Sequence, residues 1–526
     1  MSLSELSQQP GKVESIIKPV QYVAEPLALY RSLCEGRAHN LLLESAEIDS
    51  KDDLKSLMLI DAALRLECNN HKVNCQALTS NGAAILPLLA QACDAESELS
   101  ENQLTLTFTT AQDALDEDSR LKAHSVFDAL RQIILTITPL RQHPDALFIG
   151  GVFAYDMLAN FEQLPDVQEG INSCPDFVFY VAETLLLIDH QQQTSELIGS
   201  VFSGADVANQ YFAVSQRLEL LEQQIANPQP IANSNLQQVS IEQLSMDKSD
   251  DEFKQDVNQL KEHILCGDIF QVVPSRTFSL PCPHPFNAYQ QLKQQNPSPY
   301  MFYLQDSDFC LFGASPESAL KYQQESNQVE IYPIAGTRPR GLNPDGSIDR
   351  DLDSRIELEL RQDEKEKAEH IMLVDLARND VARVSEPGSR YVADLLQVDR
   401  YSQVMHLVSR VVGQLRNDLD ALHAYQACMN MGTLVGAPKV SAAKLIREVE
   451  QQRRGSYGGA VGYINGQGDM DTCIVIRSAF VKNGMAHIQA GAGVVYDSDP
   501  QSEADETRAK AQAVIHAIVA AHSAAL

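Results

Sequence analysis

Tryptophan is missing from this chain of 526 residues, and the features of several special protein classes are missing too. No uninterrupted apolar run reaches the about 18 residues that a membrane-spanning helix needs. The ten cysteines are scattered without a CxxC pair, which argues against a disulfide framework or a zinc site. The N-terminus lacks the basic start and apolar run of a signal peptide. We therefore expect a cytoplasmic protein with reduced thiols and no membrane partner.

Basic side chains are also scarce, since 41 lysines and arginines face 71 aspartates and glutamates, a formal charge of −30. A surface so negative would repel nucleic acid and anionic membranes, so neither is an expected partner. An anionic small molecule stays open as a ligand, because one pocket can be basic within an acidic protein.

The clearest change in composition begins at residue 226, where a stretch rich in Pro, Asn, Gln and Ser has no apolar stripe. Such a stretch is typical of a linker. The sequence therefore predicts an N-terminal part over 1–225, a linker over 226–248 and a C-terminal part over 249–526.

Helix-like and strand-like runs occur in both parts. Runs typical of strands lie at 146–157, 177–190, 328–336, 472–481 and 485–497. Runs typical of helices lie at 52–66, 207–225, 359–377 and 502–521. A capping box at Ser249 and Glu252 starts a further helix, which Gly267 ends. Because the elements do not alternate as in βαβ units, we predict an α+β fold, with antiparallel sheets packed together and helices on the outside.

Two of the predicted helices carry carboxylates three residues apart. Glu366 and Glu369 share one face of the first helix, and Glu503 and Glu506 lie with Lys510 on one side of the second. Paired carboxylates without His or Cys ligands suit a hard cation such as Mg²⁺. The alternative is an ordinary solvated, salt-bridged helix, and the sequence does not show whether the two helices meet.

Glycine-rich segments end two strand-like runs, at 453–464 and 489–497. Glycine there lets backbone N–H groups approach an anion, although tight turns between strands explain the same pattern. The loop PIAGTRPRG at 333–341 places two arginines after a strand-like run. It is either a turn with solvated arginines or the rim of a site for a small anion.

Three titratable residues stand in apolar surroundings. Arg477 needs a partner, either a bound carboxylate or a structural acid. His406 is a hydrogen-bonded core residue or an acid–base group. Glu317 is a helix-start carboxylate or a titrating group. Taken together, these residues describe a pocket for a carboxylated small substrate and a divalent cation.

Long motifs now show a resemblance that covers the chain from about residue 20 to the C-terminus. The motifs are PIAGTRPRG, DEKEKAEHIMLVDLARND, VMHLVSR, GAPKV, RRGSYGGAVGY, IVIRSA, QAGAGVVYDSDPQSEADET and LLLESAEIDSKDDLKS. The chain resembles the chorismate-utilising enzymes, and among them the large subunits of anthranilate synthases. The resemblance implies Mg²⁺-dependent conversion of chorismate and ammonia to anthranilate and pyruvate, through 2-amino-2-deoxyisochorismate. It also implies a separate glutamine amidotransferase subunit as the source of ammonia, and hence a hetero-oligomer.

The resemblance assigns roles by matching position. Magnesium would be held by Glu369 and Glu506. Proton transfer would fall to His406, Glu366 and Glu317, with Glu317 as the acid for the leaving hydroxyl and Glu366 as acceptor of the ammonia proton. Substrate would be bound by Gln271, Gly336, Thr337, Thr433, Tyr457, Arg477, Gly491, Ala492, Gly493 and Lys510.

Two single positions bear on the choice among related enzymes. Gln271 stands where isochorismate-forming members carry a lysine that activates water, and a neutral amide cannot act as that base. Ala335 stands where aminodeoxychorismate synthases carry a lysine that attacks the substrate. Both residues favour anthranilate synthase, with aminodeoxychorismate synthase as the alternative.

The resemblance further implies feedback inhibition by tryptophan. The residues in question are Glu44, Ser45, Lys55, Pro299, Tyr300 and Met301. The alternative is a capped helix start beside a Pro-rich turn. Two other protein classes remain as rivals, a catalytically silent amino-acid sensor and a two-carboxylate glycoside hydrolase. The first should have lost part of the catalytic set, and the second should carry aromatic sugar platforms, whereas this chain has no tryptophan.

Overall fold

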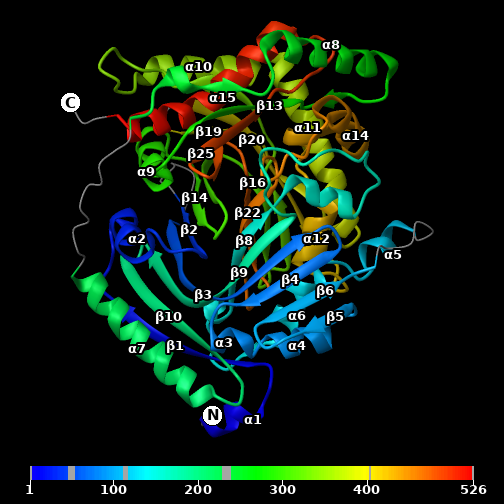
Figure 1. The fold of residues 1–526 in the computed structure, drawn as a ribbon. Coiled ribbons are helices and arrows are strands. Elements are labelled where there is room, and N and C mark those ends of the chain that lie inside the picture. Colours follow the sequence, from blue (N-terminus) through cyan, green and yellow to red (C-terminus); the bar gives the residue numbers. More distant parts are fainter. Residues whose placement is uncertain (1–2, 46–53, 110–115, 228–237, 402–403, 524–526) are drawn as a thin grey trace.

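The computed structural model describes residues 3–45, 54–109, 116–227, 238–401 and 404–523. In Figure 1 the blue and cyan N-terminal elements lie below the green to red C-terminal ones, and strands from both meet in the middle. None of the helices in these ranges is both long and apolar enough to cross a membrane.

The elements of the N-terminal part are mainly strands. Its strands are β1 (Lys12–Val20), β2 (Asn40–Glu44), β3 (Lys55–Asn69), β4 (Lys72–Ala77), β5 (Glu96–Leu99), β6 (Gln103–Thr107), β7 (Thr138–Pro139), β8 (Phe148–Phe153), β9 (Phe177–Asp189) and β10 (Thr194–Phe202). Its helices are α1 (Leu3–Gln8), α2 (Pro26–Cys34), α3 (Ser80–Ala83), α4 (Leu86–Ala92), α5 (Glu117–Leu121), α6 (Asp128–Thr136) and α7 (Val207–Ala226), with 3-10 turns η1 (Pro144–Ala146) and η2 (Tyr155–Asn160).

The C-terminal part mixes strands with longer helices. Its strands are β11 (Ser245–Met246), β12 (Gln271–Val272), β13 (Ser275–Pro281), β14 (Tyr300–Gln305), β15 (Cys310–Ser315), β16 (Ser318–Gln323), β17 (Gln328–Ile331), β18 (Ile334–Pro339), β19 (Tyr391–Arg400), β20 (Val404–Gln414), β21 (Gly436–Ala437), β22 (Ala460–Asn465), β23 (Met470–Ile474), β24 (Ser478–Lys482) and β25 (Met485–Gly491). Its helices are η3 (Ile241–Gln243), α8 (Asp250–Cys266), α9 (Pro285–Gln295), α10 (Arg350–Gln362), α11 (Glu364–Val384), α12 (Ala421–Cys428), α13 (Gly432–Val435), α14 (Lys439–Glu450) and α15 (Pro500–Ala521).

The predicted α+β class with antiparallel sheets is confirmed. Among the described strands every named pairing is antiparallel except the short β1–β7 contact. Strand pairing also crosses between the two parts of the chain, because β2 pairs with β14 and β8 pairs with β22. The two parts therefore share one hydrogen-bonded sheet network, and their division into 1–225, 226–248 and 249–526 stays a prediction.

Three expected elements differ from those observed. The run at 52–66, expected as a helix, forms most of β3 from Lys55 onward, where nearly every residue is buried on both faces. A continuous apolar run carries no period that separates a helix from a buried strand. The run at 359–377 is two helices, because the Asp363 carboxylate accepts from the backbone N–H of Lys365 and starts a new helix. The strand expected at 472–481 breaks before Arg477, whose φ is +48°.

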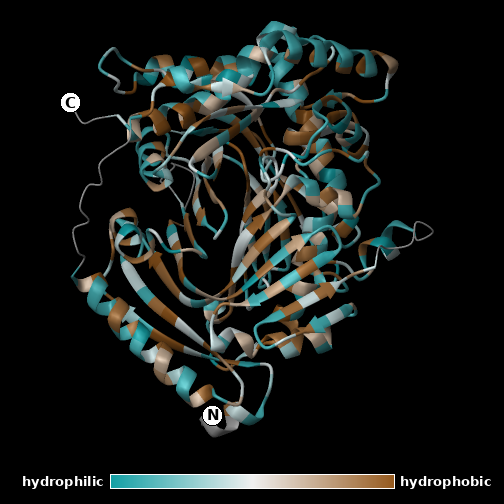
Figure 2. Cartoon of the chain, viewed as in Figure 1, coloured by the Kyte–Doolittle hydropathy of each residue, from teal (hydrophilic) through white to brown (hydrophobic). Residues whose placement is uncertain are grey.

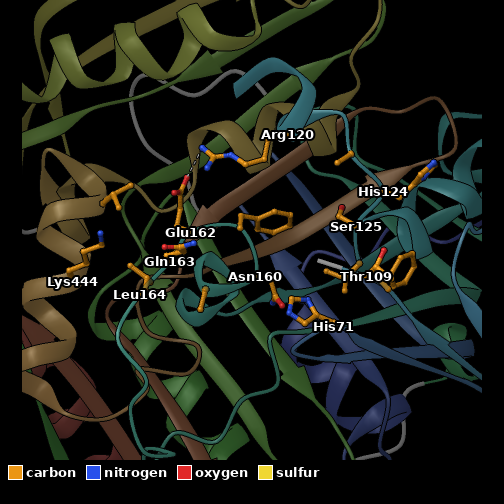
Figure 3. Close-up of a pocket in the computed structure, with 16 residues that line it drawn as sticks. His71, Thr109, Arg120, His124, Ser125, Asn160, Glu162, Gln163, Leu164 and Lys444 are labelled. Carbon is orange, nitrogen blue, oxygen red and sulfur yellow. Dashed lines mark ion pairs between the residues drawn. The ribbon is translucent and has the colours of Figure 1, made fainter. Parts of the chain in front are cut away.

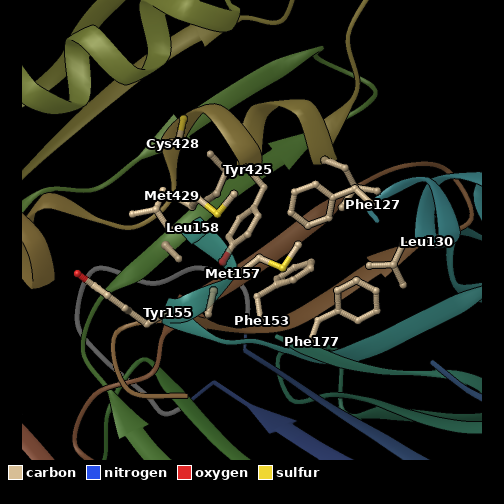
Figure 4. Close-up of a cluster of buried hydrophobic side chains, with 14 of the residues drawn as sticks. Phe127, Leu130, Phe153, Tyr155, Met157, Leu158, Phe177, Tyr425, Cys428 and Met429 are labelled. Atoms are coloured by element: carbon tan, nitrogen blue, oxygen red, sulfur yellow. The ribbon is translucent and has the colours of Figure 1, made fainter. Parts of the chain in front are cut away.

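A large apolar core spans both parts of the chain. Figure 4 shows Phe127, Phe153 and Tyr425 packed together, and the rings of Phe153 on β8 and Tyr425 on α12 stack at 4.4 Å. In Figure 2 apolar residues concentrate on the inner strands, while outer helices such as α7 alternate between apolar and polar positions. This core holds the strands whose ends form the site described next.

Candidate active site

One cavity of about 610 Å³ gathers nearly all residues that the sequence assigned to substrate, cation and proton transfer. Its lining includes Gln271, Glu317, Gly336, Thr337, Glu366, Glu369, His406, Thr433, Tyr457, Arg477, Gly491, Gly493, Glu506 and Lys510. Ala492 is the exception, because it lies fully buried in the wall between two lining glycines.

Helices α11 and α15 both contribute to the acidic side of the cavity, so their carboxylates face one space. Glu369 on α11 is close enough to Glu506 on α15, and to Glu366, that both carboxylates add to desolvation in raising the pKa of Glu369. Glu369 Oε1 accepts a hydrogen bond from Gln271 Nε2 at 3.0 Å. Glu506 pairs with Lys510 at 2.7 Å, and Lys510 also donates to the carbonyl of Gly491 at 3.0 Å.

This acidic side fits a divalent cation such as Mg²⁺. Its carboxylates repel one another, as the raised pKa of Glu369 indicates, and a cation would relieve that repulsion. Gln271 Oε1 is buried without a hydrogen-bond partner among the described residues. Those residues include no group of three or more His, Cys, Asp or Glu side chains arranged to hold a metal. Magnesium needs only one or two carboxylates, because water and substrate oxygens complete its shell.

Glu317 lies between β15 and β16, not at the start of a helix as the alternative interpretation had it. Its side chain is buried, and Thr433 Oγ1 donates to Glu317 Oε1 at 3.1 Å. Desolvation raises the pKa of Glu317 to about 8. The group is therefore mainly protonated at neutral pH and able to donate a proton.

His406 on β20 faces Thr337 on β18 across a strand pair, and Thr337 Oγ1 lies 2.9 Å from His406 Nδ1. The ring of Tyr401 contacts the imidazole edge-on at 5.1 Å. Burial, together with the positive charge of Arg477, lowers the pKa of His406 to about 4. The imidazole is therefore neutral at neutral pH and able to accept a proton.

Arg477 points to an anionic ligand. Among the described residues no carboxylate forms an ion pair or hydrogen bond with its guanidinium, and desolvation lowers its pKa. A structural salt bridge, the alternative left open by the sequence, is therefore not what the structure shows. The left-handed backbone at this residue, with φ of +48°, lies between β23 and β24 at the cavity wall. Tyr457 lines the same wall, and burial raises the pKa of its hydroxyl to about 12.

The segment 333–341, expected as a loop, is mostly strand β18, which pairs with β20, and its residues 334–337 line the rim of the cavity. Gly336 adopts φ of +81°, and a Cβ there would lie 3.2 Å from Glu366 Oε2, so glycine suits both the backbone and the close approach. Both arginines of this segment are held by acids: Arg340 makes a two-bond pair with Asp353 at 2.9 Å, and Arg338 donates to Glu366 at 2.8 Å. A turn with two merely solvated arginines, one of the two interpretations of the sequence, is therefore not what the structure shows.

Three polar residues that no motif singled out for substrate also line the cavity, namely Lys365, Gln489 and Ser498. Gln489 lies two residues before Gly491 on β25, so the strand period of two would have placed both on one face. For Lys365 and Ser498 the sequence holds no such signal.

Comparison with known proteins identifies the family. The model of the chorismate binding enzymes matches residues 40–516. The chain belongs to the chorismate binding enzyme family. Within this family it is 60% identical to anthranilate synthase component 1 of Vibrio cholerae over 98% of both chains, and 59% identical to that of Escherichia coli over 96% of both.

Solved structures of the family share the fold. The structure of anthranilate synthase component I from Streptococcus pneumoniae matches with a TM-score of 0.67 and 29% identity, over 89% of this chain and 94% of that one. The menaquinone-specific isochorismate synthase of Escherichia coli matches with a TM-score of 0.66 over 98% of this chain and 97% of that one. Its 17% identity makes that second match a likeness of fold alone.

This chorismate binding enzyme has a second cavity of about 610 Å³ where the sequence predicted an inhibitor site. Glu44, Ser45, Lys55, Tyr300 and Met301 line it, whereas Pro299 does not. The Glu44 carboxylate is already bound within the protein. The α9 residues Tyr289 and Lys293 donate to its two oxygens, each at 2.6 Å. Residues 46–53, which belong to the same predicted motif, lie outside the described residues.

A third cavity of about 540 Å³ contains none of the predicted residues. Figure 3 shows that Arg120 and Glu162, which are 3.7 Å apart, lie along one side of it. Because two cavities have the same volume and this third one is nearly as large, cavity size alone does not single out a site in this family member.

Proposed function

We propose that this chain is the chorismate-converting component of an anthranilate synthase. It combines chorismate with ammonia to form 2-amino-2-deoxyisochorismate, and it then releases anthranilate and pyruvate. This would be the first committed step of tryptophan biosynthesis. The full-length similarity to proteins named anthranilate synthase component 1 supports the proposal.

One observation carries the proposal most directly, the opposite protonation states of two buried groups in a single cavity. Glu317, with its pKa raised to about 8, can donate, and His406, with its pKa lowered to about 4, can accept. Groups whose environments push their pKa values apart are typical of an acid and a base acting together.

Glu317 and Glu366 serve the first half of the reaction. As nitrogen bonds to C2 of chorismate, both ring double bonds shift by one position and the C4–O bond breaks. The departing hydroxyl takes the Glu317 proton and leaves as water. The new ammonium group then loses a proton to Glu366.

His406 serves the second half. The neutral imidazole removes the remaining proton from C2, which lets the ring become aromatic as the bond to the enolpyruvyl oxygen breaks. The released enolpyruvyl group takes up a proton to become pyruvate. Thr337, which shares a hydrogen bond with Nδ1, keeps the imidazole oriented for this step.

Other residues that line the cavity would bind the carboxylates of the substrate. Arg477, which forms no ion pair with any described residue, supplies its guanidinium for a substrate carboxylate, and the backbone beside Gly491 and Gly493 can approach the ligand closely. Glu369 and Glu506 would hold Mg²⁺. The bound ion would neutralise a substrate carboxylate and orient the ring.

The nucleophile is assigned from two lining residues. Gln271 and Ala335 both line the cavity, and neither side chain can act as a base or form a covalent adduct. Ammonia needs no such activation, because its lone pair attacks directly once the molecule is unprotonated.

The wider setting is also part of the proposal. Relatives named component 1 imply a second component, which here would be a glutamine amidotransferase that supplies ammonia. Tryptophan would bind in the second cavity and inhibit the enzyme. The ten cysteines are all free, and nine of them are buried, which supports a location in the cytoplasm.

The test is an anthranilate fluorescence assay of the purified chain with chorismate, Mg²⁺ and ammonium salt at mildly alkaline pH. We expect emission that grows only with Mg²⁺ and is suppressed by tryptophan. Consumption of chorismate without anthranilate would indicate a sister reaction of the family. If saturating tryptophan changes neither chorismate affinity nor turnover, the inhibitor site is wrong.

A further inference from the structure

Arg338, on strand β18 at the rim of the cavity, makes a contact that neither its motif nor the family comparison explains. It does not line the cavity, yet it binds two acids of helix α11 at once. Its Nη1 donates to Glu366 Oε1 and its Nη2 donates to Asp363 Oδ2, both at 2.8 Å. A guanidinium that bridges two carboxylates has little freedom to rotate, so it fixes both partners.

The two acids hold the first turn of helix α11. Asp363 caps the helix by accepting from the backbone N–H groups of Lys365 at 3.0 Å and Glu366 at 3.1 Å. Arg338 therefore links the helix cap to the first side chain that reaches the cavity. Because Glu369 lies one turn further on, the same link also sets the position of the cation-binding acid.

Arg338 is equally tied to the strand that carries the base. Its Nη1 also donates to the carbonyl of Thr337 at 2.9 Å, and the Thr337 hydroxyl bonds His406. Through Glu366 and Thr337, the guanidinium thus connects helix α11 to the strand pair β18–β20, which carries His406.

The two oxygens of Glu366 are left in different surroundings. Oε1 is bound to Arg338, whereas Oε2 lies beside Gly336, where a Cβ would approach it to 3.2 Å. One oxygen is therefore held by Arg338, while the other lies beside Gly336, a residue that lines the cavity.

Arg338 also changes how the acids share a cation. Glu366 and Glu369 are three residues apart on one helix, and both line the cavity, so either could serve as a ligand. A guanidinium on Glu366 offsets its charge, whereas Glu369 accepts a hydrogen bond from the neutral Gln271 amide and forms no ion pair within the described part of the chain. Of the two acids on α11, the stronger attraction for Mg²⁺ therefore lies at Glu369.

We propose that Arg338 is a positioning residue that holds Glu366 through its Oε1, orients this carboxylate at the cavity and reserves it for proton transfer, leaving the cation to Glu369 and Glu506. This inference rests on the proposed function of the cavity. It adds a specific division of labour between two carboxylates that the sequence alone presents as equivalent.

The experiment compares Arg338→Ala, Arg338→Lys and a control in the full chain, with ammonium as the nitrogen donor. Arg416→Ala is a matched control. Arg416 is 24% exposed against 28% for Arg338, and it also bridges two acids, Asp118 at 2.6 Å and Asp418 at 2.8 Å, but it is not part of the cavity. The measured quantities are kcat, KM for chorismate, the Mg²⁺ concentration for half-maximal rate, and the melting temperature.

For Arg338→Ala we expect kcat to fall about 10- to 100-fold while KM for chorismate changes less than threefold, as for loss of a proton-transfer geometry. The Mg²⁺ concentration for half-maximal rate should fall, because Glu366 becomes available as a further ligand. Arg338→Lys should recover part of kcat, and Arg416→Ala should match the wild type.

A double variant separates positioning from a merely structural role. If Arg338 acts through Glu366, then Arg338→Ala combined with Glu366→Gln should be no slower than Glu366→Gln alone. Additive losses, or a wild-type kcat in Arg338→Ala, would overturn the inference. A wild-type chain that makes no anthranilate would instead refute the proposed function, so the two failures are distinguishable.

Discussion

Two cavities of equal volume, about 610 Å³ each, differ in how far the protein satisfies its own buried groups. In the catalytic cavity Gln271 Oε1 is buried without a partner in the described chain, and the Arg477 guanidinium has no acid there. In the second cavity, the proposed inhibitor site, the Glu44 carboxylate is already held by Tyr289 and Lys293. The first cavity therefore keeps buried polar groups that a ligand could satisfy, whereas the Glu44 carboxylate of the second is satisfied within the protein.

This difference matches two different tasks. A catalytic site gains from preorganised groups that wait for charge on the substrate. A regulatory site gains from groups that must exchange partners, because only a ligand with different affinities for two arrangements can shift their populations. Helix α9, which holds Glu44, also packs against α15, the helix that carries Glu506. The Glu44 contacts therefore connect the proposed inhibitor cavity, through the packing of α9 on α15, to the proposed catalytic cavity.

The largest effect is expected for Arg477→Ala, which tests the first cavity, the proposed catalytic one. We expect kcat/KM for chorismate to fall about 100- to 1,000-fold, because the substrate carboxylate loses its charged donor. The melting temperature should stay within about 2 °C, since no protein partner is lost. Near-normal turnover would remove Arg477 from the site, and a large fall in melting temperature would indicate a structural salt bridge after all.

Glu317→Gln tests the protonated acid. We expect kcat to fall about 100-fold, in the range for loss of a general acid. In the wild type, kcat/KM should decline as the pH rises through about 8, because only the protonated carboxyl donates and the pKa of Glu317 is raised to that value. The amide cannot titrate, so this decline should disappear in the variant. A wild-type profile that is flat across pH 8 would contradict the assignment.

Glu44→Gln tests the second cavity, the proposed inhibitor site. We expect the tryptophan concentration for half-maximal inhibition to rise about tenfold, as for the loss of one charged hydrogen bond, while turnover without tryptophan stays within twofold.

Glu369→Gln is the complementary variant. It should raise the Mg²⁺ requirement and leave tryptophan binding, measured by calorimetry, unchanged. If each variant disturbs both cavities equally, the contrast drawn between them is wrong.

The smallest effect is expected far from either cavity. Ser249 caps helix α8, and its hydroxyl accepts from the Glu252 N–H at 3.3 Å while Glu252 bonds back to the Ser249 N–H. Ser249→Ala should lower the free energy of unfolding by about 1 kcal/mol, as for other N-caps, and leave turnover and inhibition unchanged. Chemical denaturation combined with the fluorescence assay measures both, and altered inhibition would link α8 to the regulatory cavity.

Much of the catalytic site could be predicted from local sequence. The i, i+3 spacing of Glu366 and Glu369 and the Gly-rich end of β25 are properties of single elements, and each carries over directly into the structure. The capping box at Ser249 and Glu252 is local in the same sense, and the structure confirms it.

Other features of the fold and the site could not be predicted from the local sequence. The run that forms β3 lacks alternation because both of its faces are buried by neighbours distant in sequence. The break before Arg477 depends on a left-handed residue that no composition signals. The link from Arg338 to Glu366 joins positions 28 apart, and it arises only because α11 begins anew at Asp363.

The sequence by itself determined the fold class, the family and the set of residues that could perform the chemistry, because motifs and periodicity are written along the chain. Only the tertiary structure decided which groups meet and in which protonation state they meet. Glu317 is protonated and His406 neutral because distant segments exclude water from both. Desolvation of this kind is a property of packing, so it exists only once the chain has folded.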